Sequence, residues 1–139
     1  MKLTKPIVFV CTGNTCRSPL AESYAKSTYE NHTFTSRGIM VTDSATNPSS
    51  QQIIDEESLI HPDPPQQMSG EDAENSILLA MTRGHLDLLK DLYPDSEVYL
   101  LSEYADGSIE DIIDPIGGSY EDYRKVYSQM KSFIDELFK

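Results

Sequence analysis

Cysteine is scarce in this chain, and its scarcity argues against a secreted protein held together by disulfides and against a cysteine-ligated metal site. Only two of the 139 residues are cysteines, Cys11 and Cys16. A small secreted scaffold held together by disulfides would need more, so a reducing compartment is the better interpretation. The three histidines, His32, His61 and His85, are scattered, and no Cys-x2-Cys or His-Glu-x-x-His spacing occurs. We therefore expect no metal site and no cofactor.

Basic residues are also few. The chain has 11 lysines and arginines against 23 acidic residues, which gives a formal net charge of −12. Proteins that bind nucleic acid carry basic faces, so we expect no nucleic-acid partner. The acidic exterior would favour phosphate presented on a basic or neutral protein, although acidic residues that merely maintain solubility explain it equally well.

Long apolar runs are missing as well. No stretch approaches the run of about 20 apolar residues that spans a membrane. The charged-then-apolar pattern of a signal peptide is also absent, so we expect a cytoplasmic protein with no membrane contact. A chain of 139 residues fits a single domain, and we predict one domain over residues 1–139 with no internal linker.

One distinctive stretch lies near the N-terminus. Residues 7–10 are apolar and rich in β-formers, which predicts a buried strand. Gly13 and Asn14 tolerate left-handed backbone angles, and Ser18-Pro19 has the chemistry of a helix N-cap followed by proline. The stretch therefore predicts a strand, a tight loop and a helix, with several loop N–H groups turned inward.

Such a loop suits a bound anion. Its N–H groups, the positive end of the following helix and Arg17 would converge on one point, as a phosphate requires. The same field favours the thiolate form of Cys11 at the end of the strand, and a thiolate beside a phosphoryl group is a nucleophile. The competing interpretation is a buried cysteine near a surface arginine. We reject it because all the pieces fall within one short loop.

Residues 11–18 read Cys-Thr-Gly-Asn-Thr-Cys-Arg-Ser, and this Cys-x5-Arg-Ser loop resembles the phosphate-binding loop of the low-molecular-weight protein tyrosine phosphatases. The resemblance implies that Cys11 attacks the phosphoryl group while Arg17 and the loop N–H groups hold its oxygens. It also implies that Asn14 holds the loop's backbone and that Ser18 hydrogen-bonds the nucleophile's sulfur. The loop residues that would surround the phosphate are Thr12, Gly13, Asn14, Thr15, Cys16 and Arg17.

The leaving group needs an acid, which this family supplies from an Asp-Pro pair late in the chain. Asp114-Pro115 matches that pair, so the resemblance implies that Asp114 protonates the departing atom. Once ionised, Asp114 would activate the water that hydrolyses the cysteinyl phosphate. Without the cysteine loop, we would interpret Asp114 as an ordinary turn aspartate. The other such pair, Asp63-Pro64, lies in a proline-rich stretch that the family does not use.

Two departures from the tyrosine-directed members narrow the substrate. Thr15 stands where that branch usually has an aliphatic residue, and Ile116 and Gly117 stand where it has aromatic residues that grip a phenyl ring. Both changes resemble the bacterial protein-arginine-phosphatase branch. The resemblance implies that the partners are phosphorylated proteins, with phosphoarginine preferred and Thr15 selecting it. A tyrosine phosphatase is the alternative. Two more remote alternatives are an arsenate reductase, which needs further cysteines, and a non-catalytic phosphoprotein-binding module. We expect the protein to be a monomer.

Cys16 follows Cys11 by five residues across the curled loop. Their Cα atoms could therefore approach the separation that a disulfide requires. One hypothesis is that Cys16 is a redox partner, which captures an oxidised Cys11 and protects it from further oxidation. The other is that Cys16 is a small apolar filler.

The rest of the chain alternates strand-like runs with helical periodicity. Strands are predicted at 7–10, 33–41, 77–81 and 97–101, and helices at 19–29, 48–60, a short segment from 69, 84–92 and 119–138. We expect Leu86, Leu89 and Leu92 on an inner helix face, an exposed connection at 61–68, and a polar, acid-rich segment at 101–119. Each strand is followed by a crossover, which predicts an α/β fold: a single-domain three-layer sandwich whose four-stranded parallel sheet has helices on both faces. Active sites of such sheets lie at the C-terminal ends of the strands, where we expect Cys11.

Overall fold

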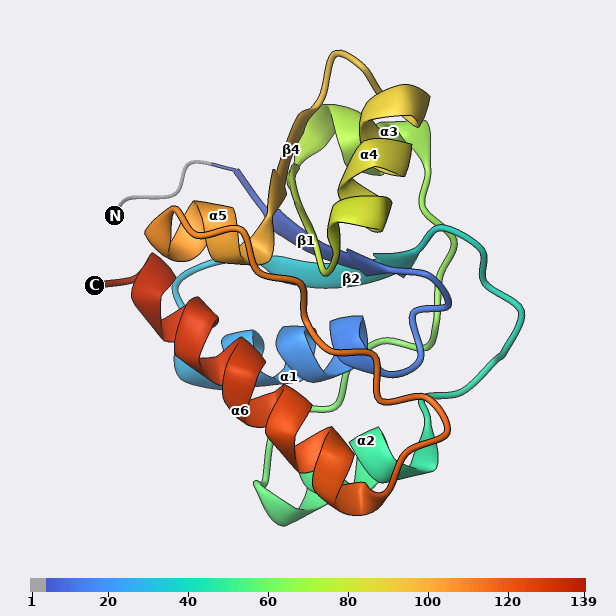
Figure 1. Ribbon diagram of the computed structural model, residues 1–139, viewed down its shortest axis with the longest axis vertical. Helices are drawn as coiled ribbons and strands as arrows, with labels where there is room; N and C mark the ends of the chain where they lie inside the picture. The colour runs from blue at the N-terminus through green and yellow to red at the C-terminus, as the bar shows by residue number, and fades with distance from the viewer. Residues whose placement is uncertain (1–4) are drawn as a thin grey trace.

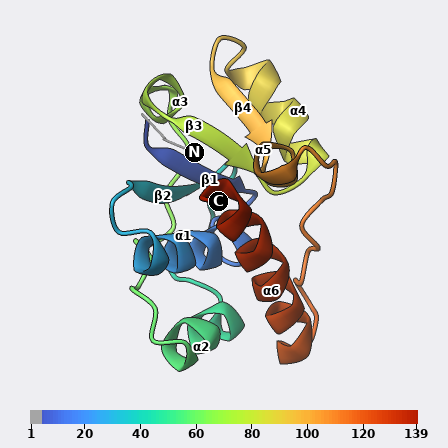
Figure 2. The same ribbon diagram turned by 90° about the vertical axis from the view of Figure 1, so that its left-hand side faces the viewer.

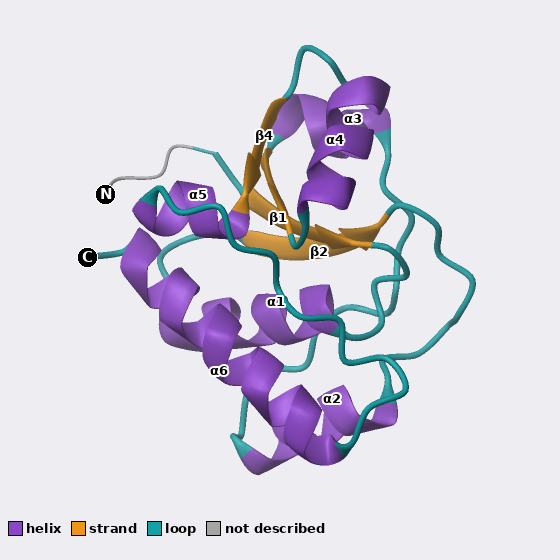
Figure 3. Ribbon diagram, viewed as in Figure 1, coloured by secondary structure: helices purple, strands orange, loops and turns teal. Residues whose placement is uncertain are grey.

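A parallel sheet lies at the centre of the molecule (Figures 1 and 3). The structure, a computed structural model, describes residues 5–139. Its strands are β1 (Ile7–Cys11), β2 (Phe34–Gly38), β3 (Ile77–Ala80) and β4 (Glu97–Leu100). They form one parallel sheet in the order β2-β1-β3-β4, which confirms the four predicted strands and their direction. All residues of β1 are buried, as expected of a central strand covered on both faces.

The C-terminal ends of the strands meet along one edge. Cys11 at the end of β1 lies opposite Gly38 of β2, and Val10 lies opposite Ala80 of β3. Ala80 in turn lies opposite Leu100 of β4. The segments that follow these strands therefore leave the sheet at the same edge, which is where ligand sites of such folds lie.

Helices cover both faces of the sheet. They are α1 (Arg17–Thr28), α2 (Pro48–Glu56), α3 (Gly70–Asn75), α4 (Arg83–Leu92), α5 (Leu101–Asp106) and α6 (Tyr120–Leu137). Helices α1, α2, α5 and α6 lie on one side and α3 and α4 on the other, which confirms the three-layer sandwich (Figures 1 and 2). Over residues 5–139, no helix has the length and apolar character to cross a membrane.

The alternation of side chains along β1 divides the core into two clusters. Ile7 and Phe9 pack with α1 and α6 in the larger cluster, whereas Val8 and Val10 pack on the side of α3 and α4. The stripe predicted for α6 is buried as expected: Tyr123, Val126, Tyr127, Met130, Phe133, Ile134 and Leu137. The long amphipathic α6 therefore closes one face of the sheet.

Helix α4 departs from its predicted inner face. Leu89 is fully buried and Leu86 packs against the smaller cluster, but Leu92 is 53% exposed. The expected inward position of Leu92 is therefore wrong. Tyr93, the next residue, packs against the cluster in its place.

Helix α1 begins earlier than predicted, at Arg17 rather than at residue 19. Cys16 is the N-cap residue, and its side chain makes no capping hydrogen bond. The prediction that Ser18 caps the helix is wrong, because the Ser18 hydroxyl hydrogen-bonds to Cys11 and Asn14 instead. Pro19 still lies in the first turn, where the backbone N–H that proline lacks would have no partner within the helix.

Helices α2 and α5 also differ from the expectation. Helix α2 starts as predicted, since the Asn47 side chain accepts a hydrogen bond from the Ser49 backbone N–H. It ends at Glu56 instead of reaching residue 60, because Ser58 adopts a left-handed φ of 54°. Helix α5 lies in the polar segment at 101–119, where the sequence predicted no helix. It follows β4 directly and ends where Gly107 takes a left-handed φ of 83°, a common helix terminator.

The proline-rich connection at residues 61–68 forms no helix, as predicted, but it is not simply an exposed loop. The Gly38 N–H donates to the Gln66 carbonyl and the Met68 N–H donates to the Gly38 carbonyl, both at 2.8 Å. Met68 is buried. The connection therefore runs beside the end of β2, next to the cysteine loop.

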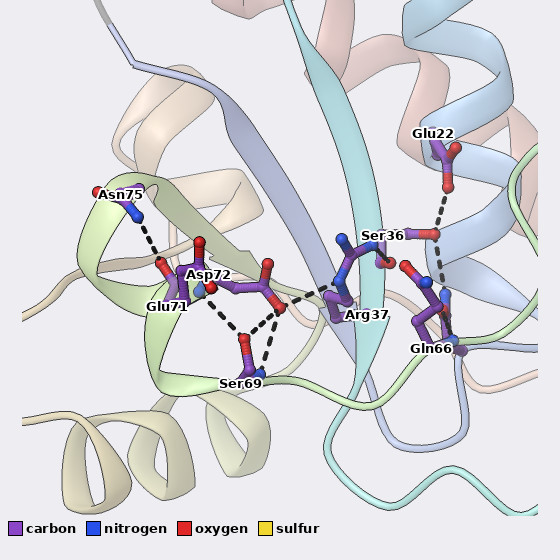
Figure 4. Close-up of polar contacts among 9 residues, drawn as sticks. Glu22, Ser36, Arg37, Gln66, Ser69, Glu71, Asp72 and Asn75 are labelled. Atoms are coloured by element: carbon purple, nitrogen blue, oxygen red, sulfur yellow. Dashed lines mark hydrogen bonds and ion pairs between the residues drawn. The ribbon is translucent and has the colours of Figure 1, made fainter.

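Helix α3 is joined to β2 by polar contacts (Figure 4). Ser69 and Asp72 form a reciprocal capping box at its start. Arg37 of β2 donates from Nε to Asp72 Oδ2 at 3.0 Å. These contacts fix the second helical layer to the strand beside β1.

Gly38→Ala should destabilise the protein. A Cβ at this position would lie 2.8 Å from the Thr12 carbonyl oxygen and 2.6 Å from the Val41 side chain. We expect a loss of about 1–3 kcal/mol in the free energy of unfolding, measured in urea. Gly70→Ala is the matched control, because its Cβ would meet nothing within 4 Å. Equal stability of the two variants would contradict this close-packing argument.

Candidate active site

The loop between β1 and α1 is held from outside through its carbonyl groups. The Cys11 and Thr12 carbonyls accept from the N–H groups of Ile39 and Met40, at 3.0 and 2.8 Å. The carbonyls of Thr15 and Cys16 likewise accept from the Asn47 N–H and the Ser50 hydroxyl, at 2.8 and 3.1 Å. In a trans peptide the N–H points opposite to the carbonyl, so the N–H groups of residues 12, 13, 16 and 17 point away from these donors, toward the inside of the curve. An inward set of N–H groups is an anion-binding concavity.

Asn14 fixes the curvature of this loop. It has a left-handed φ of 56° and is 1% exposed. Its amide nitrogen donates to the hydroxyls of Ser18 and Ser36, at 2.8 and 2.9 Å. Its amide oxygen accepts from the Gln66 N–H at 2.9 Å. Asparagine suits the position because it tolerates left-handed angles and its amide can make all three bonds.

The direction of these hydrogen bonds determines what Ser18 can do. An amide nitrogen only donates, so the Ser18 oxygen accepts from Asn14 and its own hydrogen remains free. The Ser18 hydroxyl lies 2.9 Å from the Cys11 sulfur, and both residues are buried. The hydroxyl can therefore donate its hydrogen to the sulfur.

A buried carboxylate ends this chain of hydrogen bonds. Ser36 donates to Glu22 at 2.5 Å, and Glu22 is fully buried (Figure 4). Glu22 also forms an ion pair with Lys26 and accepts from the Asp63 N–H at 3.2 Å. Our sequence reasoning missed Ser36 and the buried role of Glu22. The four-residue spacing of Glu22 and Lys26, typical of a helical ion pair, was the available signal.

Arg17 joins the loop to the segment that precedes α6. Its side chain is 6% exposed, and its guanidinium donates to the Ile112 carbonyl at 3.0 Å. The same guanidinium lies 3.8 Å from an Asp114 carboxylate oxygen. The Ile112 N–H in turn donates to the Met81 carbonyl just after β3, at 2.8 Å. The structure thus brings Asp114, from late in the chain, beside Arg17 of the cysteine loop.

Asp114 lies in a turn whose side chain remains accessible. Its carboxylate accepts from the Ile116 N–H at 3.0 Å and is 55% exposed. The Gly118 N–H closes the turn by donating to the Pro115 carbonyl at 2.8 Å. Asp114 therefore has the geometry of an ordinary turn aspartate, and it also lies beside Arg17.

A cavity of about 390 Å³ opens between the loop and this segment. It is lined by Thr12, Arg17, Thr82, His85, Asp111, Ile112, Ile113 and Asp114. His85 and Asp111 were not predicted. The rule that sites gather where parallel strands end would have indicated His85, since α4 starts just after β3. Over residues 5–139, no group of three acidic, cysteine or histidine side chains could hold a metal ion.

His85 lies at the wall of this cavity with an altered acidity. Its Nε2 is 2.8 Å from the Thr12 hydroxyl. Burial and the nearby charge of Arg17 lower the pKa of His85 to about 4. The ring is therefore neutral at neutral pH.

Cys16 is a buried residue of the loop, next to the partly buried Thr15. The Cys16 sulfur lies 3.7 Å from the Thr15 hydroxyl and 3.9 Å from that of Tyr123. Burial raises the pKa of the Cys16 thiol, and burial raises that of Tyr123 to about 12. Both groups therefore stay protonated at neutral pH. Cys11 and Cys16 are free thiols here, and Thr15 is not among the residues that line the cavity.

Comparisons with known proteins agree with this fold and loop. Residues 6–139 match the family "Low molecular weight phosphotyrosine protein phosphatase". The low molecular weight protein-tyrosine-phosphatase PtpB of Staphylococcus haemolyticus is 43% identical over 133 residues, or 94% of this chain and 96% of the relative. A YwlE arginine phosphatase mutant with a phosphorylated active-site serine has a TM-score of 0.91 at 30% identity, covering 95% of this chain and 92% of that one. The YwlE arginine phosphatase of Geobacillus stearothermophilus has a TM-score of 0.90 at 29% identity, with 96% and 90% covered.

These matches and the fold define a cysteine-based phosphoprotein phosphatase. The chain belongs to the low-molecular-weight protein tyrosine phosphatase family. The resemblance first seen in residues 11–18 therefore extends over almost the whole chain.

Mild peroxide should inactivate the protein reversibly if Cys16 is the redox partner. Peroxide would convert the Cys11 thiolate to a sulfenic acid, and Cys16 would displace its hydroxyl as water to form a disulfide. We expect mass spectrometry to detect an internal Cys11–Cys16 link, and thiol treatment to restore activity. Cys16→Ala should recover less fully. If no link forms and both proteins recover equally, Cys16 is a core filler.

Proposed function

We propose that this protein removes phosphate from phosphoarginine in proteins, acting as a monomer in the cytoplasm through a cysteinyl phosphate. The Cys11 sulfur bonds to phosphorus as the bond from phosphorus to the guanidine nitrogen breaks. Arg17 and the loop N–H groups, from Thr12 to Arg17, hold the phosphoryl oxygens. Asp114 gives its proton to the departing nitrogen. Asn14 and Ser18 support the loop and the sulfur.

The second step returns the enzyme to its starting state. Asp114, now a carboxylate, takes a proton from a water molecule whose oxygen attacks phosphorus. The bond from phosphorus to the Cys11 sulfur breaks, phosphate leaves, and the thiolate is restored. Asp114 suits the second task because its carboxylate is 55% exposed and so accessible to water.

The charges around the cavity are the observation that carries the phosphoarginine preference. Two carboxylates, Asp111 and Asp114, and a neutral His85 line the cavity together with Arg17. The leaving guanidinium is cationic and rich in N–H donors, so it gains from nearby carboxylates. No phenylalanine, tyrosine or tryptophan lines the cavity within residues 5–139, so a phenol ring would find no stacking partner there.

Three positions in the sequence support the same substrate. Thr15 replaces the aliphatic residue usual in the tyrosine-directed branch. Because Thr15 does not line the cavity, we propose that it selects phosphoarginine from within the phosphate loop, where its hydroxyl lies 3.7 Å from the Cys16 sulfur. Ile116 and Gly117 replace the aromatic residues of that branch. The two YwlE structures named as arginine phosphatases also have the high TM-scores given above.

A tyrosine phosphatase is the second candidate. PtpB of Staphylococcus haemolyticus, which is named a protein-tyrosine-phosphatase, shares 43% identity with this chain, more than the 30% shared with the YwlE mutant. Steady-state rates of phosphate release from one carrier protein bearing either phosphoarginine or phosphotyrosine separate the two candidates. A higher kcat/KM on phosphoarginine supports the proposal, and a higher value on phosphotyrosine overturns it.

Asp114→Asn should slow phosphate release by roughly a hundredfold or more, because the amide cannot supply a proton to the leaving group. The loss should be largest for substrates with poor leaving groups, measured as kcat across a series of aryl phosphates. Asp43→Asn, at an exposed position outside the cavity, serves as the control. A wild-type rate for Asp114→Asn on the poorest leaving group would require another acid.

Thr15→Ile should shift the preference toward phosphotyrosine. We expect the ratio of kcat/KM on phosphoarginine protein to that on phosphotyrosine protein to fall roughly tenfold, because a hydroxyl and a small side chain are both lost. Both rates are measured on the same preparation. A parallel loss of both activities would show that Thr15 supports the loop instead of selecting the substrate.

A further inference from the structure

His85 lies at the cavity wall, where one hydrogen bond holds its backbone and another holds its ring. It lies in the first turn of α4, where its backbone N–H donates to the Thr82 hydroxyl at 3.2 Å. Its ring Nε2 then lies 2.8 Å from the Thr12 hydroxyl, at the start of the phosphate loop. The contact joins two segments that are 73 residues apart in the chain. Thr12 itself is exposed at the cavity.

The ring carries no charge at neutral pH. Burial, followed by the charge of Arg17, lowers the pKa of His85 to about 4, against the opposite influence of Asp114 and Asp111. A protonated ring would place a second cation beside Arg17 and repel a guanidinium. A neutral ring leaves the cavity favourable to a cationic leaving group.

The Thr12 hydroxyl can accept a further hydrogen bond beside its bond to His85. The Nδ1 atom of His85 is buried and has no hydrogen-bond partner within residues 5–139. A threonine hydroxyl has one hydrogen and two acceptor positions, and its bond to Nε2 uses one of these three. At least one acceptor position on the Thr12 oxygen is therefore free in either tautomer of His85.

We propose that Thr12 is a specificity-determining residue whose hydroxyl oxygen accepts a hydrogen bond from an N–H of the leaving guanidinium, and that His85 is the positioning residue that holds this hydroxyl. The inference rests on the proposed phosphoarginine activity and adds a second contact beside Asp114. A phenol ring carries no N–H, so it gains nothing from this acceptor. The pair therefore discriminates between the two candidate substrates.

Thr12→Val tests the contact because it removes the hydroxyl and keeps the branched shape. The readout is kcat/KM on phosphoarginine protein divided by kcat/KM on phosphotyrosine protein. We expect this ratio to fall roughly tenfold, the effect of losing one hydrogen bond to a charged group. Thr42→Val, at an exposed position outside the cavity, is the matched control and should keep the wild-type ratio.

A matched pair of variants tests the role of His85. The amide nitrogen of His85→Gln can reach the place of Nε2, whereas that of His85→Asn is too short to reach Thr12. We expect His85→Gln to keep most of the wild-type ratio of kcat/KM on phosphoarginine protein to that on phosphotyrosine protein. We expect His85→Asn to lower this ratio as far as Thr12→Val does. In the Thr12→Val background, His85→Asn should cause no further fall, because His85 acts through Thr12.

The outcomes separate this inference from the proposed function. If the wild-type protein prefers phosphotyrosine, the proposed function fails and the inference is overturned with it. If the wild type prefers phosphoarginine and Thr12→Val keeps the wild-type ratio, only the inference is overturned. The positioning role of His85 would also be overturned if His85→Gln and His85→Asn lowered the ratio equally. It would likewise be overturned if the effect of His85→Asn added to that of Thr12→Val.

Discussion

The hydrogen bonds of one buried amide, that of Asn14, are the constraint on which the site depends. Its left-handed backbone turns the loop, and its side chain joins that loop to Ser18 of α1, Ser36 of β2 and the backbone of Gln66. Leaving one of these buried groups unpaired would cost about 1–3 kcal/mol. The curvature that turns the N–H groups inward is therefore maintained by three separate parts of the fold.

The same amide gives the buried polar chain a defined direction. Asn14 donates both ways, so the Ser36 hydrogen is free for Glu22 and the Ser18 hydrogen is free for the Cys11 sulfur. One hydroxyl hydrogen is therefore available to the Glu22 carboxylate and another to the Cys11 sulfur. A buried carboxylate is tolerated only with partners, which Lys26, Ser36 and the Asp63 N–H supply to Glu22.

Arg17 extends this order to the segment that carries Asp114. That segment contains no helix or strand, and in Figure 1 it is the orange loop that connects α5 to α6. It is held by the Ile112 N–H on the Met81 carbonyl and by Arg17 on the Ile112 carbonyl. The Arg17 guanidinium therefore holds the segment that carries Asp114 beside the cysteine loop, although the segment and the loop come from opposite ends of the chain.

The amino-acid sequence alone determined the features that depend on near neighbours. The strand, the curled loop and the helix around Cys11 and Arg17 lie within a few residues of one another, and apolar periodicity specified the parallel sheet. The tertiary structure decided the rest. It brought Ser36 of β2 and the backbone of Gln66 to the Asn14 amide, two partners that the sequence did not indicate. It brought His85 to Thr12 across 73 residues, a contact that no local pattern encodes because only the packing of α4 against the sheet creates it.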